Sequence, residues 1–336
     1  MIVSWMTTNR CNLKCQHCYQ DAEGVDASTE NELSTDEAKT LIDQIARSGF
    51  KIMIFSGGEP LLREDIFELV AHASSRGLRP VFGTNGMLIT PEVARGLKKA
   101  GAAALGISLD SLDEGKHNAF RGDPHAFELT LRGMESCREA GLPFQIHTTI
   151  MDWNEAELLD LMDFAVEQEA IAHYQFFLIP VGRGKYIEDT AIKVLENEDL
   201  LRRIMDKSTE VPISCKPTCA PQFVRVARQM GIDTRFTRGC LAGISYCIIS
   251  PEGIVRPCAY MMEEAGDLRK QGFDEIWETS EVFARLRTQD YSGSCGDCEY
   301  KDGCGGCRAR AAYYHEGDYM AADEYCAHGK QLLEAL

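Results

Sequence analysis

Residues 1–18 read MIVSWMTTNRCNLKCQHC, an apolar run followed by three closely spaced cysteines. Residues 2–8 are rich in β-branched and aromatic side chains, which predicts a strand. Cys11, Cys15 and Cys18 follow with C-x3-C-x2-C spacing, so one loop after this strand carries three thiols. Three thiolates can bind three irons of a cubane cluster and leave the fourth iron open for another ligand. A zinc site with His17 as the fourth ligand is the alternative, disfavoured because His17 lies inside the same tight loop.

Apolar runs alternate with helical patterns up to about residue 180. The predicted strands are residues 2–8, 51–55, 79–84, 103–109, 144–150 and 173–179, and the predicted helices are 38–46, 64–75, 91–100, 126–139 and 155–168. Ser34 and Glu37 have capping-box spacing ahead of the first helix. This alternation predicts an α/β protein in which right-handed crossovers curl a parallel sheet into a partial, TIM-like (β/α)6 barrel. A doubly wound sheet is the alternative, and in either fold the catalytic groups should follow the C-terminal ends of the strands.

The remainder of the chain divides into two parts by composition. The alternation stops over residues 186–239, where only residues 220–230 predict a helix. From residue 240 onward the sequence is Gly-rich and holds eight of the fourteen cysteines, so metal must supply part of its core. We therefore expect a barrel over residues 1–185, a bridging segment over 186–239 and a Cys-rich domain over 240–336.

Charge and hydropathy exclude several classes of protein. The net charge of −17 argues against a nucleic-acid partner, and no apolar run reaches the roughly 20 residues that span a membrane. The N-terminus lacks a signal-peptide pattern, so we expect a cytoplasmic protein whose clustered cysteines bind metal rather than form disulfides.

One segment is basic within this acidic chain. Residues 211–239, the basic island, contain one acid, Asp233, and five cations: Lys216, Arg225, Arg228, Arg235 and Arg238. Such an island can bind a small anion, or it can be a solvated helix face.

Three further motifs follow successive predicted strands. They are Ser56-Gly57-Gly58-Glu59-Pro60, Thr84-Asn85-Gly86 and Ser108-Leu109-Asp110-Ser111. Together with the cysteine triplet, these motifs resemble the radical S-adenosylmethionine (SAM) superfamily over the whole chain. The resemblance implies a [4Fe–4S] cluster with an open iron site that binds SAM. The resemblance implies that the GGEP segment binds the amino group of SAM and that Arg121 pairs with its carboxylate. The residues it implies for SAM binding are His17, Gly57, Gly58, Glu59, Pro60, Asn85, Ser108, Asp110 and Arg121.

The C-terminal cysteines resemble the SPASM extension of radical SAM enzymes. Their central C-x2-C-x5-C-x2-C run has too short a spacer for a zinc ribbon, and eight cysteines suit two four-thiolate clusters. The resemblance implies one set of Cys240, Cys247, Cys258 and Cys307 and a second set of Cys295, Cys298, Cys304 and Cys326. The family usually ends this run with C-x3-C, whereas this sequence ends it with C-x2-C. The number of auxiliary clusters, one or two, and the division of the cysteines between them are therefore open at this point.

Three cysteines lie outside these sets. Cys137 has apolar helical neighbours and is predicted to be a core residue. Cys215 and Cys219 lie in the basic island, where nearby cations lower a thiol pKa and make it reactive. We predict that Cys219 is catalytic, by binding a substrate metal, donating a hydrogen atom or completing a cluster; a loop thiol with no role is the alternative.

The segments KPTCAPQF (residues 216–223) and FTRGCLAGISYC (236–247) look like the radical SAM proteins of haem d1 and siroheme-dependent haem biosynthesis. That resemblance implies that a 5′-deoxyadenosyl radical removes or modifies acetate or propionate side chains of a siroheme-derived iron porphyrinoid. Flavodoxin or ferredoxin would supply the electron. Such a polyanion suits the basic island, so Arg225, Arg228, Arg235 and Arg238 are predicted to bind its carboxylates. The alternative is a SPASM maturase acting on a ribosomal peptide or protein side chain; an electron-transfer protein would leave the GGEP and SLDS motifs unexplained.

Overall fold

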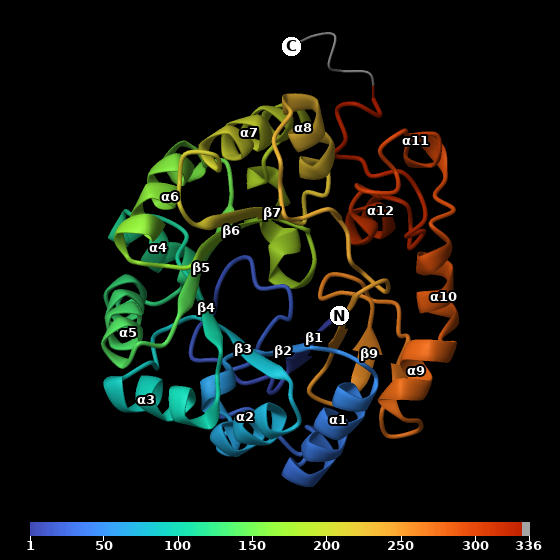
Figure 1. The fold of residues 1–336 in the computed structure, drawn as a ribbon. Helices are drawn as coiled ribbons and strands as arrows, with labels where there is room; N and C mark the ends of the chain where they lie inside the picture. The colour runs from blue at the N-terminus through green and yellow to red at the C-terminus, as the bar shows by residue number, and fades with distance from the viewer. Residues whose placement is uncertain (331–336) are drawn as a thin grey trace.

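The computed structural model describes residues 1–330 and confirms the predicted parallel barrel. Six parallel strands pair in chain order: β1 (Ile2–Met6), β2 (Ile52–Ser56), β3 (Arg79–Thr84), β4 (Ala104–Ser108), β5 (Phe144–Ile150) and β6 (Ala172–Phe177). Each strand lies within two residues of its predicted bounds. Figure 1 shows the strands as an arc inside a ring of helices, with the loop that follows β1 inside the arc.

The covering helices are α1 (Thr35–Arg47), α2 (Ile66–Ser75), α3 (Pro91–Ala100), α4 (Glu114–Arg121), α5 (Ala126–Ala140) and α6 (Leu158–Glu167), with short 3-10 turns η1 (Pro60–Leu62), η2 (Glu155–Glu157) and η3 (Gly182–Thr190). Both bonds of the Ser34–Glu37 capping box form at α1. The apolar faces of these helices and the outer faces of the strands form the main core. Helix α4 was not predicted, because its sequence EGKHNAFR is mostly polar.

The expectation that the alternation stops over residues 186–239 was wrong. This segment forms α7 (Val194–Lys207), β7 (Ser214–Thr218) and α8 (Phe223–Met230), and β7 pairs in parallel with β6. Pro217 concealed the strand in the sequence, since proline cannot donate a backbone hydrogen bond. It is tolerated because β7 is the edge strand of the sheet.

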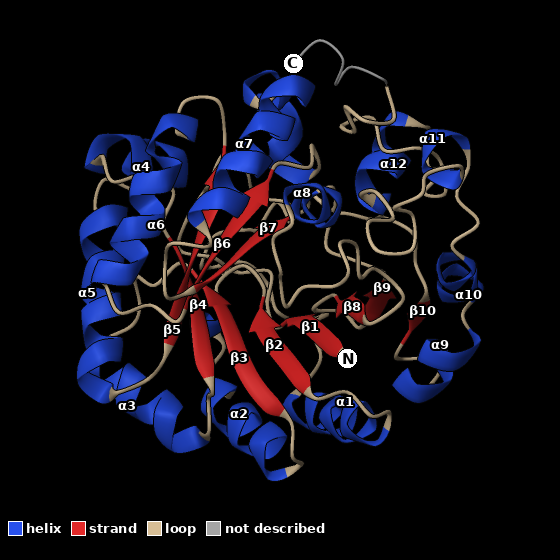
Figure 2. Cartoon of the chain, turned by 45° about the horizontal axis from the view of Figure 1, so that its top comes forward, coloured by secondary structure: helices blue, strands red, loops and turns tan. Residues whose placement is uncertain are grey.

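The C-terminal part extends the other edge of the same sheet. It contains β8 (Tyr246–Ile249), β9 (Ile254–Arg256), β10 (Gly266–Asp267), α9 (Phe273–Thr279), α10 (Glu281–Thr288), α11 (Gly293–Gly296) and α12 (Arg308–Tyr314). Strand β8 pairs in parallel with β1, and the described sheet runs β10-β9-β8-β1-β2-β3-β4-β5-β6-β7. Figure 2 shows α11 and α12 close to α8. The last six residues of the predicted C-terminal domain lie outside the described residues, and within residues 1–330 no helix is both long and apolar enough to cross a bilayer.

Candidate active site

The loop after β1 carries the N-terminal cysteines and is fixed at several points. Cys11 N donates to Glu23 O at 2.9 Å, and Arg183 Nε donates to Cys15 O at 2.9 Å. Two donors also reach sulfur: Leu13 N lies 3.4 Å from Cys11 Sγ, and Arg121 Nη1 lies 3.8 Å from Cys15 Sγ. Hydrogen bonds to sulfur stabilise thiolates that ligate an iron–sulfur cluster. The loop therefore fits the predicted cluster.

Gly57 and Gly58 bring two backbones together at this loop. A Cβ on Gly57 would lie 2.7 Å from Thr8 O, and one on Gly58 would lie 2.2 Å from Arg10 O. Gly58 N donates to Thr8 O at 2.8 Å. The glycines are thus required for packing against the cysteine loop. Among residues 1–330, none donates a hydrogen bond to either glycine carbonyl, so both oxygens are available to the amino group of SAM.

Glu59 braces the site through hydrogen bonds within the protein, and its part in SAM binding stays a prediction. Its fully buried carboxylate accepts hydrogen bonds from Thr84 Oγ1 at 2.8 Å and from Asn85 N at 2.9 Å. Burial raises the pKa of this carboxyl to about 7. Pro60 begins η1 directly afterwards and faces the core. Glu59 therefore joins the loops that follow β2 and β3.

Asn85 is likewise used within the protein. Its Nδ2 donates to Asn12 Oδ1 at 2.8 Å, and its Oδ1 accepts from Met87 N at 2.9 Å. The predicted SAM contact of Asn85 is thus replaced by a structural role, because these bonds hold the side chain against the cysteine loop.

Asp110 and Arg121 form a buried ion pair between the end of β4 and α4. Arg121 Nε donates to Asp110 Oδ2 at 2.6 Å, and Thr149 N donates to Asp110 Oδ1 at 2.9 Å. Burial opposes ionisation of Asp110, but the charge of Arg121 holds the pKa of this carboxyl below its usual range. Asp110 therefore orients Arg121 rather than binding a cofactor directly. Arg121 keeps free N–H groups, and the half-buried Ser108 hydroxyl has no partner within the described chain, so both remain SAM-binding candidates.

His17 lies beside the cluster loop in an aromatic stack. Its ring is 4.2 Å from that of Phe120, at an interplanar angle of 19°, and Phe120 in turn meets Trp153 edge-on at 5.0 Å. Burial lowers the pKa of His17 to about 3, so the ring is neutral. Its buried Nδ1 lacks a hydrogen-bond partner within residues 1–330. A flat, hydrogen-bonding group such as adenine fits this position.

An aromatic wall with two cations lies along β5–β7: His147, Tyr174 and Lys216 come from these strands, and Arg235 and Phe236 come from the loop after α8. His147 stacks on Tyr174 at 5.8 Å and 7°, and Tyr174 meets Phe236 edge-on at 6.2 Å. Lys216 Nζ and Arg235 lie 5.0 Å and 5.3 Å from the Phe236 ring centre. Tyr174 and Phe236 were not singled out in the sequence, because the period-2 pattern of β6 marks its faces without showing which one faces inward.

The other three arginines of the basic island face different surroundings. Arg225 is buried and pairs with Glu198, with Nη1–Oε1 at 2.9 Å and Nη2–Oε2 at 2.5 Å. Arg238 donates to Gln289 Oε1 at 2.6 Å and to two backbone carbonyls. The predicted carboxylate-binding roles of Arg225 and Arg238 are therefore wrong, since protein acceptors use their guanidinium groups. Arg228, although on the same helix as Arg225, is exposed, which leaves its role a prediction.

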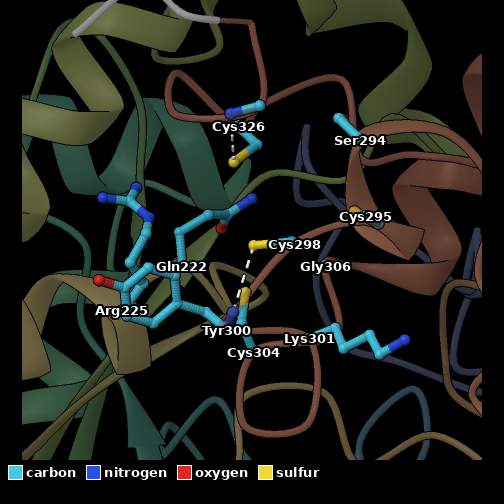
Figure 3. A pocket seen from close by; sticks show the side chains of 12 residues that line it. Gln222, Arg225, Ser294, Cys295, Cys298, Tyr300, Lys301, Cys304, Gly306 and Cys326 are labelled. Carbon is cyan, nitrogen blue, oxygen red and sulfur yellow. Dashed lines mark hydrogen bonds between the residues drawn. The ribbon is translucent and has the colours of Figure 1, made fainter.

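The second predicted set of C-terminal cysteines comes together in one pocket (Figure 3). Cys295, Cys298, Cys304 and Cys326 all line it. Backbone N–H groups lie 3.4 Å from the sulfurs of Cys295 and Cys298 and 3.3 Å from that of Cys326. These contacts suit thiolates of an iron–sulfur cluster.

The first predicted set is only partly assembled. Cys240, Cys258 and Cys307 pack in one cluster of side chains. Cys247 instead lies fully buried in the main core. Within residues 1–330, no group of three His, Cys, Asp or Glu side chains is arranged to hold a single metal ion.

The remaining cysteines are buried thiols. Cys137 lies in the main core, as predicted. Burial raises the pKa of Cys215 to about 11 and also raises that of Cys219. Nearby cations were predicted to lower the pKa values of these two thiols and so make them reactive. That prediction was wrong, because desolvation outweighs the charges of the cations.

Residues 5–165 match the profile of the radical SAM superfamily, and residues 240–299 match that of SPASM, an iron–sulfur cluster-binding domain. A Methanosarcina barkeri protein named AdoMet-dependent heme synthase is 42% identical to this chain over 340 residues, covering 97% of this chain and 95% of that protein. The chain belongs to the radical SAM superfamily.

Two further proteins are similar to this radical SAM enzyme over most of its length. Fe-coproporphyrin III synthase of Methanosarcina barkeri is 32% identical over 97% of this chain and 87% of that protein. The crystal structure of Streptococcus suis SuiB bound to precursor peptide SuiA has a TM-score of 0.78 at 18% identity, covering 97% of this chain and 75% of that chain. The latter likeness shows the fold alone.

This radical SAM enzyme uses SAM, a [4Fe–4S] cluster and auxiliary iron–sulfur clusters. Cys11, Cys15 and Cys18 are the residues that would hold the SAM-binding cluster. Arg121 and Ser108 lie at the same end of the barrel and would orient SAM.

Proposed function

We propose that this radical SAM enzyme converts propionate side chains of an iron tetrapyrrole into vinyl groups and so forms haem. When bound and reduced, SAM supplies methionine and a 5′-deoxyadenosyl radical that removes one hydrogen atom from the propionate. The remaining substrate radical then loses CO2 and one electron, which leaves a vinyl group and balances the electron used in SAM cleavage. The 42% identity with AdoMet-dependent heme synthase over almost the full length of both chains supports this reaction.

The observation that carries the proposal is the aromatic wall with its cations. A porphyrin is flat and aromatic, so its ring can stack on Tyr174 and Phe236. Its carboxylates need positive partners, which Lys216 and Arg235 supply beside the same Phe236 ring. Burial lowers the pKa of Lys216, so an anionic substrate would stabilise the protonated amine. His147 extends the wall as a neutral ring, because burial lowers its pKa to about 4.

The cellular context belongs to the same proposal. We propose a cytoplasmic enzyme that receives its electron from flavodoxin or ferredoxin and acts without a membrane or nucleic-acid partner. The net charge of −17 supports the absence of a nucleic-acid partner.

The test is an anaerobic reaction with dithionite, SAM and Fe-coproporphyrin III, in which porphyrin mass and 5′-deoxyadenosine are followed together. We expect each vinyl group to be accompanied by one deoxyadenosine and the loss of CO2. Deoxyadenosine without a change in the porphyrin would refute this substrate and redirect the search to a ribosomal peptide.

Lys216→Met tests the binding site itself. Loss of a charge-assisted contact worth about 1.5–3 kcal/mol should raise KM roughly 10-fold or more, with a smaller effect on kcat. Lys99→Met is the matched control, because it makes the same change at an exposed lysine on α3, outside the basic island. Equal KM values for wild type and Lys216→Met would contradict the assigned site.

A further inference from the structure

We infer that Cys219 is the fourth thiolate of the first auxiliary iron–sulfur cluster, together with Cys240, Cys258 and Cys307, and that Cys247 is a core residue without a metal role. The inference rests on the arrangement of these five cysteines. It does not depend on the proposed tetrapyrrole substrate.

Cys247 faces away from the other cysteines. It lies on β8, in parallel register with Val3 of β1, and alternates with Tyr246, whose hydroxyl donates to Ser4 Oγ at 3.0 Å. Side chains two apart on a strand share a face, and Cys247 and Ile249 both lie fully buried in the main core.

Cys219 occupies a constrained position at the end of β7. Its φ of +63° lies in the left-handed region, which is unfavourable for a residue with a Cβ. Arg310 Nη2 fixes the turn by donating to Cys219 O at 3.0 Å. A strained backbone that its surroundings hold in place is a recurrent feature of functional sites.

The turn after Cys219 packs against the segments that carry two other cysteines. A Cβ on Gly239 would lie 2.5 Å from Pro221 Cβ and 2.8 Å from Cys304 O. Gly239 N donates to Gly303 O at 2.8 Å, and Cys240 N donates to Cys304 O at 3.3 Å. These contacts bring the β7 turn, Cys240 and the loop leading to Cys307 into one unit.

The fourth segment of this unit carries Cys258. Tyr260 N donates to Cys258 Sγ at 3.4 Å. Cys219, Cys240, Cys258 and Cys307 all pack in one cluster of side chains, which also includes Cys295 from the edge of the second set.

The surroundings also suit an anionic group. Arg310 is 1% exposed, and its partner Asp323 lies 3.4 Å away. A buried guanidinium that bonds to the Cys219 carbonyl would offset part of the negative charge of a tetrathiolate cluster. On assembly each thiol gives its proton to solvent and its sulfur to an iron, with iron and sulfide supplied from outside the chain.

The test measures iron directly rather than activity. In a chain carrying Cys11→Ala, Cys15→Ala and Cys18→Ala, the remaining iron reports the auxiliary clusters alone. We expect Cys219→Ala in this background to lose up to one cluster of iron, about four per chain, or to show the EPR signal of an oxidised three-iron cluster. Cys247→Ala should retain iron, sulfide and EPR spectrum, as should the core control Cys137→Ala.

Two further variants separate ligation from folding. Cys219→Gly removes the thiol but accepts the left-handed φ without strain, so it should lose iron as Cys219→Ala does. Cys247→Val keeps an apolar side chain in the core and should retain iron, with folding monitored by circular dichroism. Full iron with an unchanged EPR spectrum in both Cys219 variants would overturn the inference. Iron loss from a folded Cys247→Val chain would do so too.

Discussion

Arg225 and Glu198 form a buried ion pair between α8 and α7, and Arg225→Ala should therefore destabilise the protein strongly. The two side chains are 2% and 1% exposed, and two parallel hydrogen bonds join them. Truncating Arg225 would leave the Glu198 carboxylate buried, and among residues 1–330 its remaining charged partner would be the half-exposed Arg202 at 3.1 Å.

The magnitude follows from this geometry. Removing one partner of a buried ion pair typically costs about 3–5 kcal/mol, because the other charge stays desolvated. At about 2 °C per kcal/mol for a chain of this size, the midpoint of thermal unfolding should fall by about 6–10 °C. The double variant Arg225→Met/Glu198→Leu should recover most of this loss, since apolar side chains of similar size replace both charges.

The assay is anaerobic thermal unfolding of the cluster-loaded protein at a fixed scan rate. Arg228→Ala is the control, because this exposed residue lies three positions further along α8 and its loss should change stability by about 0.5 kcal/mol or less. Equal unfolding temperatures for Arg225→Ala and Arg228→Ala would refute the reasoning. A raised KM for substrate without a loss of stability would restore Arg225 as a substrate-binding residue.

Two further predictions concern the cluster loop and acid stability. Gly58→Ala would place a Cβ 2.2 Å from Arg10 O and so displace the cysteine loop. Iron at the N-terminal site and SAM cleavage should then be lost, while the iron of the auxiliary clusters remains. Wild-type iron content and wild-type SAM cleavage would contradict this prediction. His173 is fully buried, and burial lowers its pKa from 6.5 to about 3, so it stays neutral in the folded state. The unfolded state therefore binds the extra proton, and stability falls with pH from about 6.5 downward, by about 2 kcal/mol between pH 7 and pH 5 for this one group. His173→Leu should lose less stability over that range, as measured by unfolding temperature, and an unchanged pH profile would show that another group titrates.

Local patterns in the sequence were sufficient for most of the barrel. The run at residues 79–84 and the helix at 91–100 match β3 and α3 without adjustment, because a strand with apolar side chains and a helix with Thr90 as its cap specify themselves locally. The cysteine triplet could likewise be found from the sequence alone, since one loop carries all three thiols. The seventh strand was missed because SCKPT is a short run of mixed polar and apolar side chains, and its pairing with β6 depends on a sheet that is already formed.

The contacts of the site were decided by tertiary structure. Sequence motifs named Glu59, Asp110 and Arg225, but the fold turned each of them toward a partner within the protein: Thr84, Arg121 and Glu198. Burial makes an unpaired charge costly, and the partner comes from a segment that spacing in the sequence cannot identify.

The auxiliary cysteines show the same division between what the sequence determines and what the tertiary structure decides. Their number and the C-x2-C pairs, read from the sequence, indicated iron–sulfur sites. The placement of Cys247 depends on which face of β8 meets β1, and that of Cys219 on how the turn after β7 packs against residues 239–240. Sequence thus determined which chemistry the chain can support, because ligand type is a local property. Strand pairing and burial decided which side chains meet, because those depend on segments far apart in the chain.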